Sequence, residues 1–385
     1  MTKARALLVA SLVLLAIAAS AHGAGYRTVA GSGDDAVPVV VVRGTPGEMG
    51  LALGSLLKAE IQGLVKVFLG TLQAAEPEEY SNEALDKAWA SVGPYTSPRF
   101  EQELRGIAEG AGIPFETLRR LHMIPVVSEY SCSGAAIWGK ATRNGNLYQI
   151  RNLDYMTEVG LQDFPAVVVY IPDKGVAHVN VTFAGYIGVN TGMNAAGIAL
   201  TEMGDSPASD KPYDLDGVHF TTMFRDILYD AGSLDDAVSM VKEARRIKKY
   251  HYIIGDGASK QGVKMLAHAP DLVIWRDNDE TDEVAPRILD DVVYNAEGRD
   301  PIAYAHLKKY AGRYDHDAVI QLSKSVGSLG GNLLNVVYDA TDLELWVAYA
   351  EGDECAYRRV YVHVPFRKLV ESPSVPEGAV VFERK

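Results

Sequence analysis

The chain has 385 residues, of which 48% are hydrophobic and 23% charged, the proportions of a soluble globular protein with a sizeable core. Its length allows one large domain or two ordinary ones. The formal net charge of −13 argues against nucleic acid or an anionic membrane surface as a partner, because both would repel the protein.

The start of the chain has the layout of a secretory signal peptide. Lys3 and Arg5 precede an apolar run at residues 6–19, and small residues at 19–23 offer cleavage sites. The run of about 14 residues is shorter than the roughly 20 that a membrane-spanning helix needs. We therefore expect residues 1–23 to be removed on export to the periplasm or the extracellular space, with no stable membrane insertion afterwards. An uncleaved membrane anchor is the alternative.

Residues 24–131 are expected to be mainly helical. The valine-rich run Val37–Arg43, closed by Gly44 and Pro46, predicts one buried strand. Helical periodicity follows near residues 47–72, 82–91 and 100–111, and again from residue 115. The segment ends in a predicted loop near residues 128–131.

Beyond residue 131 the pattern changes to short apolar runs separated by turn signals, which predict strands. The runs lie near residues 132–138, 147–150, 166–171, 178–183, 198–202, 252–255, 262–267, 272–275, 292–294, 333–338, 344–349 and 360–363. Helical patterns lie near residues 218–229, 233–246, 301–311 and 318–323. Asn144-Gly145 predicts a two-residue hairpin turn. Because no repeat or linker divides the chain, we expect residues 24–385 to fold as one compact unit of sheets layered with helices.

Cys132 is a candidate nucleophile at the junction of the helical and strand-rich parts. Arg151 and Asp154 follow the next predicted strand, so a hairpin would bring both beside Cys132. A guanidinium beside a thiol favours the nucleophilic thiolate. Two other interpretations remain open: an ion pair of Arg151 and Asp154 at a strand end, and a disulfide between Cys132 and Cys355, which would remove the nucleophile.

A lone thiol needs a general base, and the thirty residues after Cys132 contain no histidine. Cleavage before Cys132 would supply one, because a new α-amino group has a pKa of about 7.7–8, close to the pH at which a base works best. Asp154 could orient that amine by a hydrogen bond. The result would be a nucleophile activated by its own N-terminal amine.

Several motifs together resemble the choloylglycine hydrolase and penicillin acyltransferase group of N-terminal-nucleophile (Ntn) hydrolases. Cys132-Ser-Gly134 and Arg151-Asn-Leu-Asp-Tyr155 resemble the start of that group's mature chain and the motif after its next strand. The resemblance is closer to the penicillin acyltransferase branch, peptidase family C45. Its precursor segment is similar to Gly44–Gly50 and Glu103–Gly110, and its Gly-x-Asn-x-x-Gly-Leu pattern is similar to Gly192–Ile198.

This resemblance implies an α+β fold, a four-layer αββα Ntn-hydrolase sandwich with a mainly helical precursor segment at residues 24–131 and a β-chain at residues 132–385. It also implies self-cleavage between Ser131 and Cys132, with the two fragments remaining associated. Cys132 would then form an acyl-enzyme from a small-molecule amide or N-acyl substrate and pass the acyl group to water or an amine. Asn295 falls where the family places an oxyanion-hole asparagine, and no cofactor is implied.

Three more residues, Asn194, Thr201 and Glu202, are weaker candidates for the oxyanion or substrate site. Thr201 and Glu202 stand near the place where the family has a second asparagine, and Asn194 could equally be a turn residue. Ser131 precedes the nucleophile where the family often has glycine. We expect no metal, because the acidic run at residues 277–283 lacks the central glycine of a calcium loop and the histidines lack ligand spacing.

Two other functions fit the same sequence. The first is a lipid amide or ester hydrolase, as in ceramidase-like members of the same fold, which a long apolar cleft would favour. The second is a non-catalytic exported binding protein, for which the chain would stay intact and Cys132 would be dispensable. A general amidase acting on N-acyl amino acids, peptides or related linear amides is the interpretation that we prefer.

Overall fold

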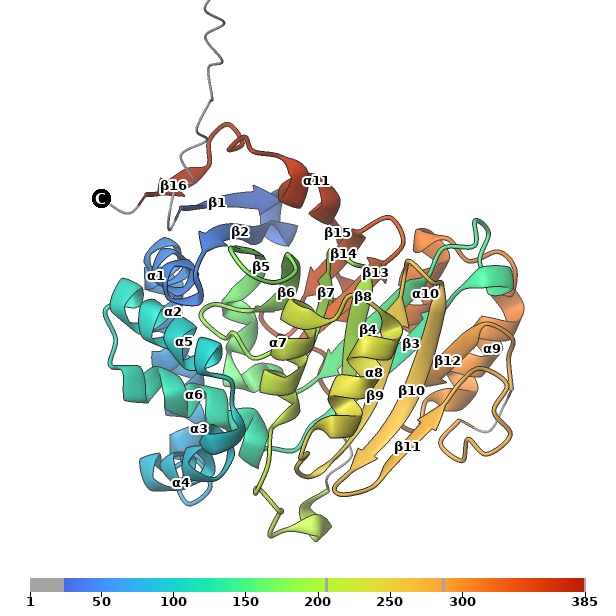
Figure 1. The fold of residues 1–385 in the computed structure, drawn as a ribbon, viewed down its shortest axis with the longest axis horizontal. Helices are drawn as coiled ribbons and strands as arrows, with labels where there is room; N and C mark the ends of the chain where they lie inside the picture. The colour runs from blue at the N-terminus through green and yellow to red at the C-terminus, as the bar shows by residue number, and fades with distance from the viewer. Residues whose placement is uncertain (1–23, 205–206, 286–287, 384–385) are drawn as a thin grey trace, which may run out of the picture.

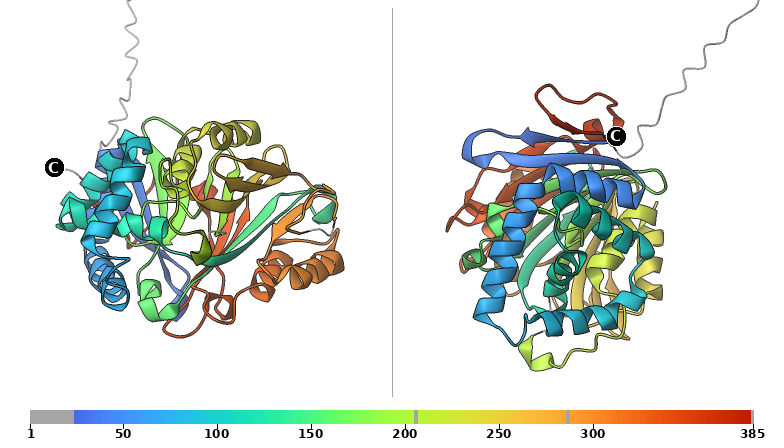
Figure 2. Two further views of the ribbon diagram at one scale, coloured as in Figure 1. Left: turned by 90° about the horizontal axis from the view of Figure 1, so that it is seen from below. Right: turned by 90° about the vertical axis from the view of Figure 1, so that its left-hand side faces the viewer.

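Two β-sheets pack face to face in the computed structural model, which describes residues 24–204, 207–285 and 288–383 (Figures 1 and 2). The predicted signal peptide, residues 1–23, lies outside the described residues. Strand β3 (Ser131–Ile137) crosses β8 (Ile198–Gly204) and β9 (Lys249–Asp256) of the other sheet. Helices α7 (Phe220–Asp230) and α8 (Leu234–Glu243) cover β7 (Thr191–Asn194) and β9. Helix α10 (His316–Ser325) covers β4 (Tyr148–Asp154) and β13 (Leu334–Asp339). The layers therefore follow the order helix, sheet, sheet, helix, and the predicted α+β, four-layer αββα fold is confirmed.

The larger sheet has ten strands among the described residues. In spatial order they are β11 (Leu272–Trp275), β10 (Gln261–His268), β9 (Lys249–Asp256), β8 (Ile198–Gly204), β7 (Thr191–Asn194), β6 (His178–Phe183), β5 (Pro165–Pro172), β2 (Val37–Gly44), β1 (Gly25–Ala30) and β16 (Val380–Phe382). Strand β2 lies parallel to β5 and antiparallel to β1. The predicted buried strand near residue 37 is thus an inner strand of this sheet.

The smaller sheet is antiparallel. Its strands are β12 (Val292–Asn295), β3 (Ser131–Ile137), β4 (Tyr148–Asp154), β13 (Leu334–Asp339), β14 (Glu344–Tyr349) and β15 (Val362–Val364), in that order. Strands β3 and β4 form the predicted hairpin. The prediction of a two-residue turn at Asn144-Gly145 is wrong, because a longer connection joins Ile137 at the end of β3 to Tyr148 at the start of β4. The chain leaves the ladder at Trp138, whose N–H donates to Asp291 O at 3.0 Å, and makes a short 3₁₀ turn at Gly139–Ala141 before β4.

Residues 24–131 form a cluster of helices at one end of the larger sheet (Figure 1). They are α1 (Pro46–Leu56), α2 (Lys58–Leu64), the π-helical turn η2 (Val65–Leu69), α3 (Gly70–Ala75), α4 (Asn82–Val92), α5 (Pro98–Ala111) and α6 (Phe115–Val127). The predicted helix at residues 47–72 is therefore interrupted, first at Leu57, which has φ −116° and ψ 24°. The other helices of this segment lie where the sequence predicted them.

Helices α1 and α5 pack so closely that glycine is required at their contact. A Cβ atom on Gly50 would lie 2.2 Å from Glu103 O, and one on Gly106 would lie 2.2 Å from Gly47 O. These glycines belong to the two upstream segments that resemble the family's precursor. That resemblance therefore reflects a helix–helix contact.

The remaining helices follow the strands of the second part of the chain. They are α7 (Phe220–Asp230), α8 (Leu234–Glu243), α9 (Asp300–Tyr310), α10 (His316–Ser325) and α11 (Phe366–Glu371). Ser233 caps α8 as its sequence predicts, accepting a hydrogen bond from Asp236 N at 3.2 Å. Within the described ranges, no helix is both long and apolar enough to cross a membrane.

A buried ion pair joins the upstream helices to the second part of the chain. Nη2 of Arg225 on α7 lies 2.7 and 2.6 Å from the two carboxylate oxygens of Glu103 on α5, and both side chains are 1% exposed. The Arg225 guanidinium also stacks over the Tyr170 ring at 3.8 Å. Residues 24–131 thus contribute both sheet strands and buried polar contacts to the common fold.

Candidate active site

Cys132 is the second residue of β3, and its side chain is fully buried, whereas Ser131 before it is exposed. Arg151 on β4 pairs in register with Gly134 and donates from Nη2 to Cys132 Sγ at 3.4 Å. The hairpin therefore brings the thiol and the guanidinium together as predicted. Cys132 and Cys355 are both free, so the disulfide interpretation is wrong.

The thiol is held in its neutral form in the continuous chain. Burial raises the pKa of Cys132 well above its usual range; Arg151 lowers it, but the carboxylates of Glu202, Glu297 and Asp154 raise it further. Arg151 thus favours the thiolate, as predicted, but in the continuous chain burial outweighs the effect of the guanidinium on the pKa of Cys132. A proton acceptor is still needed before the sulfur can attack.

Arg151 and Glu202 form a second buried pair beside the thiol. Arg151 Nη2 lies 3.6 Å from Glu202 Oε2, and both side chains are 0% exposed. Burial raises the pKa of Glu202 to about 8, and Arg151 partly offsets that effect. Nε and Nη1 of Arg151 have no hydrogen-bond partner within the described part of the chain, which leaves donors available to a ligand.

The backbone nitrogen of Cys132 contacts a carboxylate that the sequence analysis did not single out. Cys132 N donates to Glu297 Oε2 at 2.9 Å, and Ser131 Oγ donates to the same oxygen. Glu297 follows β12, two residues after Asn295, so its placement depends on the turn into α9. Only the proximity to Asn295 could have pointed to Glu297 from the sequence.

Asp154 is near the site but is bonded elsewhere. Its Oδ2 lies 2.6 Å from Arg299 Nη2, and its Oδ1 accepts from Asn332 Nδ2 at 2.8 Å and Ser328 N at 3.1 Å. Arg299 Nη2 also donates to Cys132 O at 3.3 Å. In the continuous chain Glu297 therefore contacts the Cys132 nitrogen and Asp154 anchors Arg299, and the orientation of a free α-amino group by Asp154 stays a prediction.

Asn295 lies beside β3, the strand that contains Cys132. It is the last residue of β12, pairs with Gly134 and is 2% exposed. Its Oδ1 accepts from Glu297 N at 3.0 Å, which leaves Nδ2 pointing away from that bond, buried and without a partner among the described residues. Asn295, Ser131 and Glu297 line one open cleft. An unpaired amide donor at this place suits an oxyanion.

Asn194 has a structural role in a turn. Its Nδ2 donates to Leu228 O at 3.3 Å and Ala231 O at 2.8 Å, and its Oδ1 accepts from Ala196 N and Ile198 N. Both amide hydrogens and the carbonyl oxygen are thus engaged. The prediction of Asn194 as an oxyanion or substrate residue is wrong for that reason.

Thr201 joins the two sheets next to β3, the strand that contains Cys132. Its Oγ1 donates to Ile150 O at 3.1 Å and accepts from Gln149 Nε2 at 2.9 Å. Its methyl group is so close to the backbone of Gly134 that a Cβ on that glycine would lie 2.6 Å away. Of the three weaker candidates, Glu202 is the one whose side chain pairs with Arg151 beside the Cys132 thiol.

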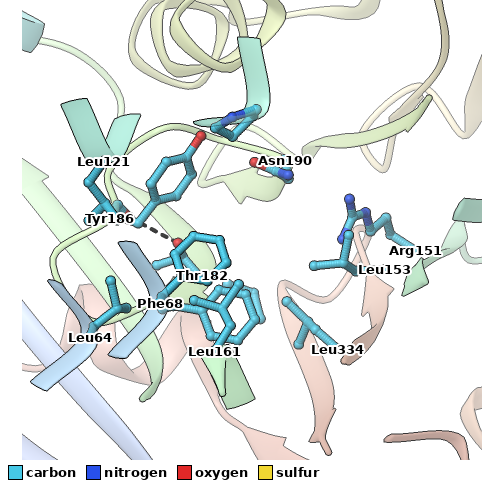
Figure 3. Close-up of a pocket in the computed structure, with 13 residues that line it drawn as sticks. Leu64, Phe68, Leu121, Arg151, Leu153, Leu161, Thr182, Tyr186, Asn190 and Leu334 are labelled. Carbon is cyan, nitrogen blue, oxygen red and sulfur yellow. Dashed lines mark hydrogen bonds between the residues drawn. The ribbon is translucent and has the colours of Figure 1, made fainter. Parts of the chain in front are cut away.

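A small apolar cavity of about 70 Å³ lies on the Arg151 side of the site (Figure 3). Its apolar walls come from both parts of the chain, and Arg151 lies next to Leu153 at one edge of it. Lining residues are Leu64, Phe68, Leu121, Pro125, Arg151, Leu153, Leu161, Val181, Thr182, Phe183, Tyr186, Asn190 and Leu334. The guanidinium that contacts the Cys132 thiol thus also borders the cavity. Among the described residues, no group of three or more His, Cys, Asp or Glu side chains could hold a metal ion.

Comparison with known families agrees with this geometry. Residues 141–280 match the family model described as acyl-coenzyme A:6-aminopenicillanic acid acyl-transferase. The family resemblance is confirmed over this segment. Arg151 and Asp154 lie within the matched segment, Cys132 shortly before it and Asn295 beyond it.

Similar proteins are known at lower identity. The chain is 29% identical to protein dcd1B of Dictyostelium discoideum over 289 residues, which cover 69% of this chain and 56% of that protein. It is 28% identical to protein dcd1A of the same organism over 247 residues, 56% of this chain and 55% of that protein. The chain thus spans about half the length of the curated relatives that it matches.

Some solved structures are also similar to this chain, at lower sequence identity. An N-acylethanolamine-hydrolyzing acid amidase ortholog of Caenorhabditis elegans has a TM-score of 0.43 and 16% identity, covering 61% of this chain and 100% of that one. Penicillin V acylase of Agrobacterium tumefaciens has a TM-score of 0.41 and 13% identity, covering 57% of this chain and 83% of that one.

Proposed function

We propose that the protein is a self-processing cysteine hydrolase of the Ntn type, which cuts the Ser131–Cys132 bond and then cleaves or exchanges linear amide bonds. The observation that carries this proposal is the buried Cys132 thiol, 3.4 Å from the Arg151 guanidinium and one residue from the exposed Ser131. The match of residues 141–280 to an acyl-transferase family supports the reaction class.

In the proposed processing step, Cys132 Sγ attacks the carbonyl carbon of Ser131, the C–N bond breaks, and water hydrolyses the resulting thioester. The new α-amino group of Cys132 then serves as the base that activates its own thiol. Sγ attacks the acyl carbon of a substrate, and the amine takes the thiol proton and passes it to the leaving nitrogen. Asn295 Nδ2 donates to the oxyanion. Water or an amine finally releases the acyl group.

The apolar cavity supplies an acyl-binding site for this reaction. Its walls would remove the apolar part of an acyl group from water, which is worth about 25 cal/mol per Å² of buried apolar surface. Arg151 stands between the cavity and the thiol, so an acyl group bound there would have its polar end near the guanidinium. We therefore propose N-acyl amino acids, peptides or related amides with an apolar acyl group as substrates.

The two fragments are proposed to remain together after cleavage. Strand β2, upstream of the cut, lies between β1 and β5 of the larger sheet, and Glu103 pairs with Arg225 across the cut. Release of residues 24–131 would expose a strand edge and leave a buried charge unpaired. The predicted signal peptide at residues 1–23 supports export, so we propose a precursor that matures in the periplasm or outside the cell.

Intact masses of the purified protein test the proposal. Under denaturing and reducing conditions, two fragments are expected, the larger beginning at Cys132. An uncut chain that neither hydrolyses amides nor reacts with thiol-directed acylating probes would instead support the exported binding protein.

Replacing Asn295 by alanine is expected to lower kcat about 100- to 1,000-fold, because one oxyanion donor is lost. KM should change little, since the donor acts mainly in the transition state. Steady-state kinetics on the best amide of a substrate screen would measure both. Asn278→Ala, in an exposed loop, is the control and should behave as the wild type. Unchanged kinetics of Asn295→Ala would remove Asn295 from the oxyanion hole.

Replacing Leu161 by tryptophan is expected to narrow the apolar cavity and to lower kcat/KM for long acyl chains at least tenfold. Short acyl chains, which need less of the cavity, should be affected less. Leu329→Trp, the same substitution at a residue that is 86% exposed, is the matched control. A series of amides of increasing acyl length provides the measurement. If fatty amides are the best substrates of the wild type, the result favours the ceramidase-like lipid hydrolase. If Leu161→Trp lowers kcat/KM equally for all acyl lengths, the cavity is excluded as the acyl site.

A further inference from the structure

The scissile bond of the proposed processing step is held by one carboxylate. Glu297 Oε2 accepts hydrogen bonds from Cys132 N, at 2.9 Å, and from Ser131 Oγ, which are polar groups on the two sides of the Ser131–Cys132 bond. Glu297 Oε1 is buried and has no hydrogen-bond partner among the described residues. The carboxyl therefore touches the atom that must leave when the bond breaks.

Breaking this bond requires one proton at the leaving nitrogen. When Sγ bonds to the Ser131 carbonyl carbon, the thiol loses a proton, and when the C–N bond breaks, the Cys132 nitrogen gains one to become an amine. The two changes balance, so no other reactant is consumed before water hydrolyses the thioester. The nitrogen accepts its proton only from a group within hydrogen-bond distance of it.

We propose that Glu297 is the acid that protonates the Cys132 nitrogen as the Ser131–Cys132 bond breaks. This inference rests on the proposed self-processing and adds to it a residue and a role. The proton that Glu297 gives up is replaced by the one that the thiol loses. Once the bond is cut, the Glu297 carboxyl group remains beside the new α-amino group and holds it near the thiol.

The other two carboxylates near Cys132 have other partners in the continuous chain. Asp154 is paired with Arg299 on its Oδ2 and accepts from Asn332 on its Oδ1. Glu202 lies beside Arg151. Glu297 alone among these three accepts from the Cys132 nitrogen in the continuous chain.

Burial raises the pKa of Glu297 to about 7, an acidity suited to this role. The hydrogen bonds from Ser131 and from Cys132 N and the positive charge of Arg299 lower this pKa, but burial has the larger effect. A substantial fraction of the carboxyl is therefore protonated near neutral pH. The titratable and charged groups around Glu297 are Cys132 on β3, Asp154 on β4, Glu202 on β8, Arg299 and Asp300 at the start of α9, and Glu129 and His251 along the same cleft.

The role predicts a distinctive pH profile for self-cleavage. The reaction needs an ionised thiol and a protonated Glu297. Below pH about 7 the carboxyl is protonated, so the rate rises with the thiolate fraction; above it, loss of the acid cancels the gain in thiolate, and the rate becomes level. In Glu297→Gln the acid is absent, so the rate should keep rising with pH, about tenfold per pH unit.

The test follows the uncut precursor by mass spectrometry from pH 5 to pH 9. Glu297→Gln is expected to process about 100-fold or more slowly than the wild type near neutral pH, in the range typical of general-acid catalysis, with the difference shrinking at higher pH. Glu297→Asp keeps a carboxyl and should process slowly while keeping the level region. Glu129→Gln removes a carboxylate from the same cleft, one that accepts from Tyr213, and should process as the wild type does.

Three results would overturn the assignment. Cleavage of Glu297→Gln at the wild-type rate would exclude Glu297 from the reaction. A slower rate that keeps the wild-type level region would show that Glu297 only supports the local structure. A wild-type chain that is never cut before Cys132 would overturn the proposed function together with this inference, whereas the first two results leave self-processing intact.

Discussion

Replacing Cys132 by alanine is expected to leave the chain in one piece and to abolish amide turnover. Both reactions of the proposed function begin with attack by the Cys132 sulfur, and the free thiol in contact with Arg151 is the nucleophile available to the Ser131 carbonyl. Loss of a nucleophile that works as a unit with its base lowers turnover by many orders of magnitude. Intact masses and amide hydrolysis by the same preparation provide the measurement.

Cys355→Ala is the matched control, because it removes the chain's other cysteine, which is partly buried and free. It should process and turn over as the wild type does. Cys132→Ser should process slowly, since a hydroxyl can make the same acyl shift, and should turn over far less well than the thiol. A cut and active Cys132→Ala protein, or full activity of Cys132→Ser, would contradict the mechanism.

Replacing Glu103 by alanine is expected to lower the free energy of unfolding by about 3–5 kcal/mol. The substitution leaves Arg225, which is 1% exposed, with a buried positive charge and no carboxylate. Urea unfolding would measure the loss in the uncut Cys132→Ala background, so that both proteins unfold as single chains.

Glu101→Ala is the control on the same helix. Glu101 pairs with Arg105 one helical turn away, but both side chains are well exposed, at 42% and 58%. An exposed pair of this kind contributes about 0–1 kcal/mol. Equal losses for the two variants would show that the buried pair stabilises the joined segments no more than a surface pair does.

The regular elements of this fold are largely predictable from local pattern. Strands such as Val37–Gly44 and Leu334–Asp339 are apolar runs bounded by turn residues, and the predicted helices at 82–91 and 100–111 lie within a few residues of α4 and α5. Strands β1 and β7 were missed because their residues mix polar and apolar types without an alternating pattern. Their pairing with β2 and β6 makes them strands.

The site was predictable where strand pairing determines it. Cys132 and Arg151 meet because a hairpin joins their strands, and Asn295 reaches the same place through the pairing of β12 with β3. Glu297 was missed because a turn, whose geometry no motif records, directs its side chain to the Cys132 nitrogen. Asn194 was wrongly predicted because the same Asn-x-x-Gly pattern also forms a turn in which the asparagine side chain accepts hydrogen bonds from the backbone of the turn itself.

The pairing of strand β2 determines how a protein cut at the proposed site would refold. It belongs to the residues upstream of the proposed cut, yet it pairs with β5 from the residues downstream of it, with Val39 beside Val167 and Val42 beside Tyr170. In the uncut chain this contact forms within one molecule. In a cut protein that has been fully unfolded, the same contact would require two separate chains to meet, so recovery would become a bimolecular reaction whose yield depends on protein concentration. The position of this one strand thus favours folding of the chain before the proposed cut.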